Sequence, residues 1–375
     1  MPPESDANSE VMSEVAVFGD NRGLLSQVLN DSTLYPIKPL QKNLRDNLLD
    51  KTFAICRPRA KRQAEYFRRQ FKRSGSQLLV SLIDNVEFLG ILSNPDTNHR
   101  TVAIQNGVRL PDTEWLYSID RFKAMNCRHQ YQHDIFLTWG EWDAERYLQL
   151  GGSARELIAV GSLADSIHRA KSEFIPERHQ IGVLEMRNPR NFFFDVLSFP
   201  PRNRQIMSDF SQNVRTLYSH LERFCRSEAT QPLFVLNSTH ELAPQLQLLD
   251  GLYPNNKKIH YDALNTLASY DGVMSCHVVV GVLSSLLVEV LGRGRKILAF
   301  NPSGNADLDF PIDGIWTLRD SRYEAFEERL RIIIEMSASK WDNEVRVVRK
   351  SLIAYDPQAP TDVVIRKLVN DLIAT

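Results

Sequence analysis

The chain has 375 residues, of which 43% are hydrophobic and 24% are charged, and its formal net charge is -1. This length is sufficient for two hydrophobic cores, and the near-neutral charge excludes a global field that would attract nucleic acid. The four cysteines form no C-x-x-C pair, which argues against a zinc site or a disulfide framework and favours a reducing cytoplasm.

Residues 1–12 are polar and acidic, so we expect disorder there and neither a secretion signal nor a transit peptide. No apolar run is long enough to span a membrane, so any membrane contact would be peripheral. The segment from Arg57 to Arg73 holds eight basic residues and one acidic residue. It is either a solvated helix face or a contact for anionic lipid or an anionic glycan. A contact with lipid would place the protein in the cytoplasm, peripheral to the inner membrane.

The first half alternates short apolar runs with helical patterns, which predicts a parallel sheet covered on both faces. The predicted strands are 15–18, 52–56, 77–83, 101–104, 135–138 and 157–160, with a helix over 144–150. A linker is expected over 165–179. The first domain is therefore predicted to span 13–170.

Polar residues follow three of these strands directly. Asp84 follows 77–83, Gln105, Asn106 and Arg109 follow 101–104, and Asp143 lies just beyond 135–138 together with Glu141. The carboxyl ends of parallel strands meet at one edge of a sheet, so we expect these side chains to lie together. The alternative is that Asp, Asn and Gly are simply loop formers.

The second half repeats the pattern and predicts a second domain over 178–340. Its predicted strands are 180–184, 232–236 and 257–261, followed by the strand, helix and strand of 272–302, and its predicted helices are 207–225, 263–269 and 324–336. Helices over 342–352 and 361–374 make up a C-terminal segment, 341–375, that is expected to pack back on the first domain.

Within 272–302, the turn between strand and helix carries Ser284 and Ser285. The first turn of a helix has unpaired N–H groups and a partial positive charge, so a phosphate fits there and hydroxyls add donors. Glu289 lies one turn further along and could accept hydrogen bonds from a ribose. The simpler alternative is that one serine only caps the helix.

This organisation resembles the GT-B glycosyltransferases, in which two Rossmann-like domains with parallel sheets face a central cleft. Bacterial members that use CMP-activated acidic sugars, such as sialyltransferases and Kdo transferases, carry a His-Pro motif after one strand and a Ser-Ser or Ser-Thr motif after a later one. The segment from Asn237 to Pro244 looks like the first and Ser284-Ser285 like the second, although His240 is followed by Glu241 and the proline comes later. The IQNG and WGEWD segments also resemble bacterial surface-carbohydrate biosynthesis proteins.

The resemblance implies transfer of an acidic sugar, Kdo or sialic-acid-like, from a CMP donor to a bacterial surface glycan such as lipopolysaccharide or capsule. His240, Ser284 and Ser285 would stabilise the charge of the leaving phosphate. No DxD motif follows a clear strand, so no metal is expected, and the nucleotide sugar is a co-substrate rather than a cofactor. Arg187 and Glu289 complete the predicted donor contacts, and Gln105, Asn106 and Arg109 the predicted acceptor contacts.

The acceptor hydroxyl needs a base, for which Asp84 is placed best because partial burial would raise its pKa. Glu141 and Asp143 are rivals, and Asp84, Glu185 or Asp143 could instead act as a nucleophile if the enzyme retains configuration. Two other functions stay open. One is a GT-B transferase with a UDP-sugar, GDP-sugar or CDP-glycerol donor, and the other is a non-catalytic GT-B-like module that binds a glycan or serves as a scaffold.

Overall fold

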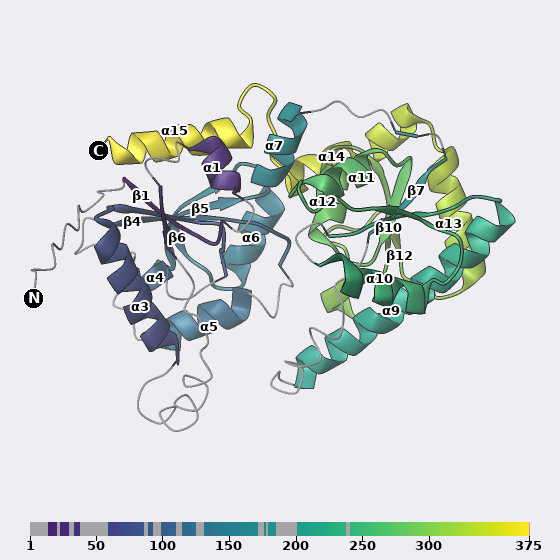
Figure 1. Ribbon diagram of the computed structural model, residues 1–375, viewed down its shortest axis with the longest axis horizontal. Coiled ribbons are helices and arrows are strands. Elements are labelled where there is room, and N and C mark those ends of the chain that lie inside the picture. The colour runs from purple at the N-terminus through teal and green to yellow at the C-terminus, as the bar shows by residue number, and fades with distance from the viewer. Residues whose placement is uncertain are drawn as a thin grey trace, which may run out of the picture.

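The protein contains two parallel β-sheets, each of six strands and each flanked by helices, as Figure 1 shows for the computed structural model. The structure describes residues 14–20, 23–29, 34–37, 59–85, 89–92, 99–109, 115–124, 131–171, 176–177, 179–184, 201–237 and 241–374. Both sheets have helices on their two faces, which confirms the predicted α/β class.

The first sheet has the order β2-β1-β3-β4-β5-β6, and every neighbouring pair is parallel. Its strands are β1 (Val15–Phe18), β2 (Leu34–Ile37), β3 (Leu78–Ser81), β4 (Arg100–Ile104), β5 (His133–Thr138) and β6 (Ala154–Ala159). The sequence did not predict β2, which contains Pro36 and lies at the sheet edge, where a missing backbone donor is tolerated. The strand predicted over 52–56 lies outside the described residues.

The central strands of this sheet supply both of its apolar faces because successive side chains point to opposite sides. In β5, Ile135 and Leu137 belong to one cluster of buried residues and Phe136 to the other. The first cluster lies under α1 (Leu24–Val28), α7 (Leu163–Lys171) and α15 (Thr361–Ile373). The helices near the other face are α3 (Arg59–Ser74), α4 (Leu89–Leu92), α5 (Leu116–Ala124) and α6 (Glu141–Gln149).

The second sheet has the order β12-β11-β10-β7-β8-β9 and is also parallel throughout. Its strands are β7 (Ile181–Leu184), β8 (Leu233–Val235), β9 (Lys258–His260), β10 (Val278–Gly281), β11 (Lys296–Phe300) and β12 (Thr317–Leu318). Its helices are α9 (Pro201–Ser227), α10 (Leu242–Leu252), α11 (Ala268–Met274), α12 (Ser285–Gly292), α13 (Tyr323–Glu335) and α14 (Ala338–Leu352), with a short 3-10 helix over Ala306–Leu308.

The helix predicted over 263–269 is wrong in position, because α11 begins at Ala268. The side chains of Asp262 and Asn265 each accept a 2.9 Å hydrogen bond from the amide two residues later, those of Leu264 and Leu267. Such bonds hold the backbone in turns and compete with a helix.

The segment predicted as a linker contains α7, which joins the two halves through a row of polar contacts. Asp165 and Arg293, the residue that follows α12, form a buried ion pair, and His168 Nε2 lies 2.9 Å from Asp271 Oδ1 of α11. Asp165 and His168 are three residues apart and so lie on the same face of α7. At the other end of the chain, α15 returns to the first sheet, where Ile365 and Val369 are buried beside α1 and α7 (Figure 1).

Candidate functional site

The polar segments that follow β3, β4 and β5 gather at the carboxyl edge of the first sheet, as the parallel register requires. The loop after β4 also reaches the second half of the protein. The amide of Val108 donates a 2.9 Å hydrogen bond to Ser285 Oγ, the first residue of α12. Gly107 lies so close that a Cβ atom there would be 2.9 Å from the same oxygen. The predicted acceptor loop and the predicted phosphate site are therefore in direct contact.

The start of α12 has the geometry of an anion site. Ser284 is the N-cap residue, with extended backbone at φ -146° and ψ 139°, and its side chain makes no capping hydrogen bond. Its carbonyl accepts the first helical bonds, from the amides of Leu287 and Val288. The side chain of Ser284 is therefore not used to cap the helix, and the first turn retains the positive end of the helix dipole.

Asp84 is fully buried and its carboxylate is held by two neighbours. Arg109 binds both carboxylate oxygens, with a 3.0 Å bond from Nε and a shorter contact from Nη2. Trp115 Nε1 donates a further 2.9 Å bond. Arg109 also donates to Asn106 Oδ1 at 2.6 Å. The structure thus brings Asp84, Asn106 and Arg109 together as one network, and this network occupies the oxygens that a base would need.

Asp143 lies in the first turn of α6 and is only 1% exposed, yet its Oδ1 atom has no hydrogen-bond partner among the described residues. Burial raises the pKa of this carboxyl to about 7, and the charge of Asp84 adds to the increase. A hydrogen bond from Gln105 and the charge of Arg109 act in the opposite direction. Desolvation therefore favours the neutral form of the Asp143 carboxyl.

Gln105 connects the ends of β4 and β5. Its Oε1 atom accepts a 2.9 Å bond from the Trp139 amide, and its Nε2 atom donates to the carbonyl of Gly107 at 3.1 Å. The Trp139 indole donates in return to the Gln105 carbonyl at 2.9 Å. Sequence reasoning missed Trp115 and Trp139 as partners of this network, because only the fold reveals which polar groups their indole N–H groups reach.

Glu289 is buried on α12 and is 3% exposed. Its Oε1 atom accepts a 2.7 Å bond from Tyr270 OH and a shorter one from Ser162 Oγ. Ser162 directly precedes α7, so this carboxylate extends the row of polar contacts between the two halves. Its predicted contact with a ribose stays a prediction.

Three of the predicted site residues, Glu185, Arg187 and His240, lie outside the described residues. The segment that follows His240 is α10, where Gln245 is fixed by the end of the preceding strand. Gln245 accepts a 2.9 Å bond from the Asn237 amide and donates to the Asn237 carbonyl at 3.0 Å. The site roles of Glu185, Arg187 and His240 therefore stay predictions.

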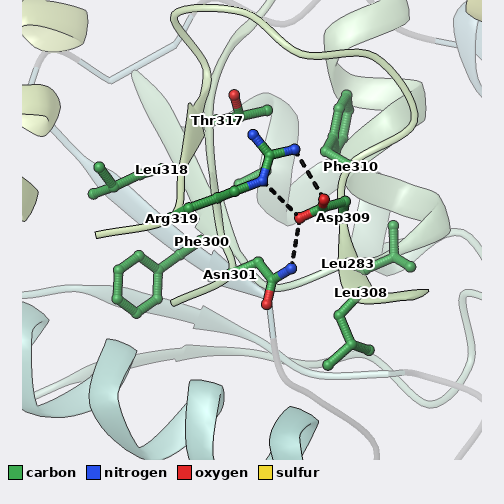
Figure 2. Close-up of a pocket in the computed structure, with 10 residues that line it drawn as sticks. Leu283, Phe300, Asn301, Leu308, Asp309, Phe310, Thr317, Leu318 and Arg319 are labelled. Carbon is green, nitrogen blue, oxygen red and sulfur yellow. Dashed lines mark hydrogen bonds and ion pairs between the residues drawn. The ribbon is translucent and has the colours of Figure 1, made fainter. Parts of the chain in front are cut away.

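A small pocket opens at the carboxyl ends of β11 and β12, beside the turn that carries Ser284 (Figure 2). Leu308, Phe310 and Leu283 form part of an apolar wall. The polar wall is a network in which Asp309 accepts bonds from Asn301 Nδ2 at 2.6 Å and from Arg319 Nε at 3.0 Å. The pocket therefore has apolar surface next to fixed polar groups.

Within the described ranges, no group of three or more His, Cys, Asp or Glu side chains is arranged to hold a metal ion. None of the helices in that part of the chain is long and apolar enough to cross a membrane.

A family model described as "putative O-antigen biosynthesis protein" matches residues 102–367, which is more than half of the chain. No curated protein matched the sequence.

Solved structures resemble the whole chain at low identity. UDP-GlcNAc 2-epimerase from Neisseria meningitidis bound to UDP-GlcNAc is 11% identical with a TM-score of 0.54, covering 96% of this chain and 100% of that one. The epimerase from Methanocaldococcus jannaschii, in complex with UDP-GlcNAc and UDP, is 10% identical with a TM-score of 0.55 and the same coverage. The wall teichoic acid polymerase TagF, soaked with CDPG, is 12% identical with a TM-score of 0.50, covering 99% of this chain and 91% of that one. At these identities the likeness shows the fold alone, and it confirms the predicted GT-B arrangement.

Proposed function

We propose, on the premise that this chain belongs to the O-antigen biosynthesis family matched over residues 102–367, that it transfers a sugar from a nucleotide-activated donor to a bacterial surface glycan. The observation that carries the proposal is the contact of Val108 with Ser285. It sets the start of α12, suited to a phosphate, against the polar edge of the first sheet. A donor phosphate at α12 would therefore lie beside groups able to bind an acceptor and move its proton.

Stabilisation of the leaving phosphate is assigned to α12. The amides of its first turn and the Ser284 hydroxyl would interact with the charge that grows as the bond to the sugar breaks. The oriented amides need no metal ion for this role. His240 remains a candidate for a further donor on the basis of the sequence pattern.

Proton transfer from the acceptor hydroxyl is assigned to Asp143 in preference to Asp84. A general base works best when its pKa lies near the working pH, and the pKa of Asp143 is raised to about 7. Asp84 is committed to Arg109 and Trp115, so it would instead hold Arg109 beside the acceptor. Glu141 stays a candidate base and Glu185 a candidate nucleophile, and the choice between base and nucleophile depends on the stereochemistry of the reaction.

The donor is proposed to be a CMP-activated acidic sugar, on the strength of the Ser-Ser turn and the His240 segment. Two other donor classes have support from the fold, since structures that share it contain UDP-GlcNAc or were soaked with CDPG. A non-catalytic scaffold is the alternative from a different class. Action in the cytoplasm goes with a nucleotide-sugar donor and is part of the same proposal.

A thermal-shift panel of CMP, CDP, UDP and GDP separates these possibilities, because a ligand that binds only the folded state raises its melting temperature. We expect CMP to raise it and the Ser284→Ala variant to reduce the shift. A shift with UDP or GDP but not with CMP would exclude the CMP donor and keep the transferase. If no nucleotide shifts the melting temperature, the scaffold function is favoured.

A further inference from the structure

Helix α3 packs on the first sheet through one apolar face. Phe67 and Phe71, four residues apart, are 3% and 1% exposed and belong to the buried cluster on that side of the sheet. Phe67 also meets Phe18 of β1 edge to face, with ring centroids 4.6 Å apart. These contacts fix the rotation of the helix, so its opposite face is held toward solvent.

The opposite face is strongly basic. Arg68, Arg69, Lys72 and Arg73 are all exposed. Residues four apart lie on the same side of a helix, so these form two neighbouring rows. Lys61 and Arg62 stand seven residues before Arg68 and Arg69 and extend the same rows by position. The first turn of α3 contains no acidic residue, and Glu65 is its single carboxylate.

Three of these cations lack carboxylate partners among the described residues. Elsewhere on the surface, Arg226 pairs with Glu222 at 2.6 Å and Arg331 with Glu228 at 2.7 Å. By contrast, Arg69, Lys72 and Arg73 form no ion pair with any described residue. The positive charge of these three side chains is therefore uncompensated within the described part of the protein, although the whole chain has a net charge of only -1.

We propose that this face of α3 docks the protein onto an anionic lipid bilayer. An α-helix of 16 residues is about 24 Å long, and its two basic rows would meet a flat charged surface along that length. Each Lys or Arg near such a surface contributes about 1 kcal/mol to binding. The attraction is electrostatic, because the exposed positions described on α3 include no large apolar side chain that would insert.

A bilayer fits this face better than a single-stranded nucleic acid does. Proteins usually bind single strands with aromatic rings on which the bases stack. The rings of Phe67 and Phe71 are buried, and Tyr66 is half-buried with its ring edge to face against Phe67. A basic helix without an exposed aromatic ring matches a surface of headgroup charge.

The test is co-sedimentation of the full chain with vesicles, using phosphatidylcholine alone or mixed equally with phosphatidylglycerol. We expect binding only to the anionic vesicles, weakening as salt is raised above about 0.1 M. The variant Arg69→Gln, Lys72→Gln, Arg73→Gln should bind at least about tenfold more weakly. A control variant removes three other exposed cations, Arg155→Gln, Arg215→Gln and Lys350→Gln, and should bind like the wild type.

Three outcomes would overturn the assignment: equal binding to both kinds of vesicle, equal loss in the two variants, or no loss in the α3 variant. Retention on a soluble anionic polysaccharide, lost in the α3 variant while vesicle binding is absent, would assign the face to a glycan. The test does not depend on a nucleotide, so its failure is separate from failure of the proposed transferase activity.

Discussion

The amide nitrogen of Val108 and the hydroxyl oxygen of Ser285 are hydrogen bonded at 2.9 Å, although the two residues are 177 positions apart in the sequence. This bond joins the loop after β4 of the first sheet to the start of α12 of the second. It gives the two adjacent serines different roles. Ser285 connects the halves of the protein, whereas the Ser284 side chain makes no capping hydrogen bond and is proposed to contact the donor phosphate.

Ser285→Ala should therefore lower stability and Ser284→Ala should not. Loss of the Ser285 hydroxyl leaves the half-buried Val108 amide without its acceptor, at a cost of about 1–3 kcal/mol in the free energy of unfolding. The Ser284 side chain makes no capping bond, so its removal should cost less than about 0.5 kcal/mol. Urea denaturation of both variants measures this difference, and equal losses would contradict the division of roles.

The buried carboxyl of Asp143 should make stability depend on pH. Its pKa is raised to about 7 by burial, so between the ordinary pKa and 7 the folded state holds a proton that the unfolded state has released. Stability should fall as pH rises through that range, by at most about 1.4 kcal/mol per pH unit. Asp143→Asn should remove this fall and raise the melting temperature at pH 8. If the stability of wild type and variant changes with pH in the same way, Asp143 is ionised in the folded state over the whole range. That result would contradict the prediction.

The ion pair of Asp84 with Arg109 should be strongly coupled. Asp84→Asn leaves Arg109, which is 12% exposed, without its charged partner, and such losses cost about 3–5 kcal/mol. Adding Arg109→Gln to this variant should restore part of the stability, because the unpaired charge is then gone. Chemical denaturation of the two single variants and the double variant gives the coupling. Additive losses would mean that the pair is not formed in solution.

The loop after β5 packs tightly on the end of α14, which makes Gly140 sensitive to any side chain. A Cβ atom there would lie 2.0 Å from the carbonyl oxygen of Ser351, a backbone atom that cannot rotate away. We expect Gly140→Ala to cost about 1–3 kcal/mol. The matched control is Gly251→Ala in α10, where the added Cβ would meet no atom of another part of the protein within 4 Å. This variant should be more stable than the wild type by about 0.5–1 kcal/mol. Thermal unfolding that ranks the two variants in the opposite order would contradict the packing of this loop.

The strands of both sheets were largely predictable because their apolar runs bury side chains on both faces. Edge elements were not. Pro36 lowers the strand propensity of the β2 segment, and β12 has only two residues, too few to give a strand pattern. The segment of α7 was predicted as a linker because its apolar residues are interrupted by polar ones that the fold also buries, with Asp165 and His168 at 0% and 2% exposure. Two of their partners, Arg293 and Asp271, lie more than a hundred residues away, so local sequence gives no sign of these contacts.

The site was predictable as a location but less so in its details. Strand ends placed Asp84, Gln105 and Asp143 near one edge, as parallel topology requires. Hydrogen bonds from Arg109 and Trp115 engage the carboxylate of Asp84 rather than that of Asp143, and the positions of these two donors come from the fold. The sequence favoured Asp84 because it ends an apolar strand. The structure buries both carboxyls and leaves an oxygen without a partner only on Asp143 among these two.

The central claim is that the first turn of α12 holds the phosphate of a nucleotide. Isothermal titration calorimetry with CMP tests it most directly, comparing the wild type with Ser284→Ala and with Ser339→Ala, a control on α14 far along the chain. We predict measurable CMP binding that weakens at least about fivefold in Ser284→Ala, the effect of losing one hydrogen bond to a charged group, and that is unchanged in Ser339→Ala. Equal binding by all three proteins would contradict the assignment of the phosphate to α12.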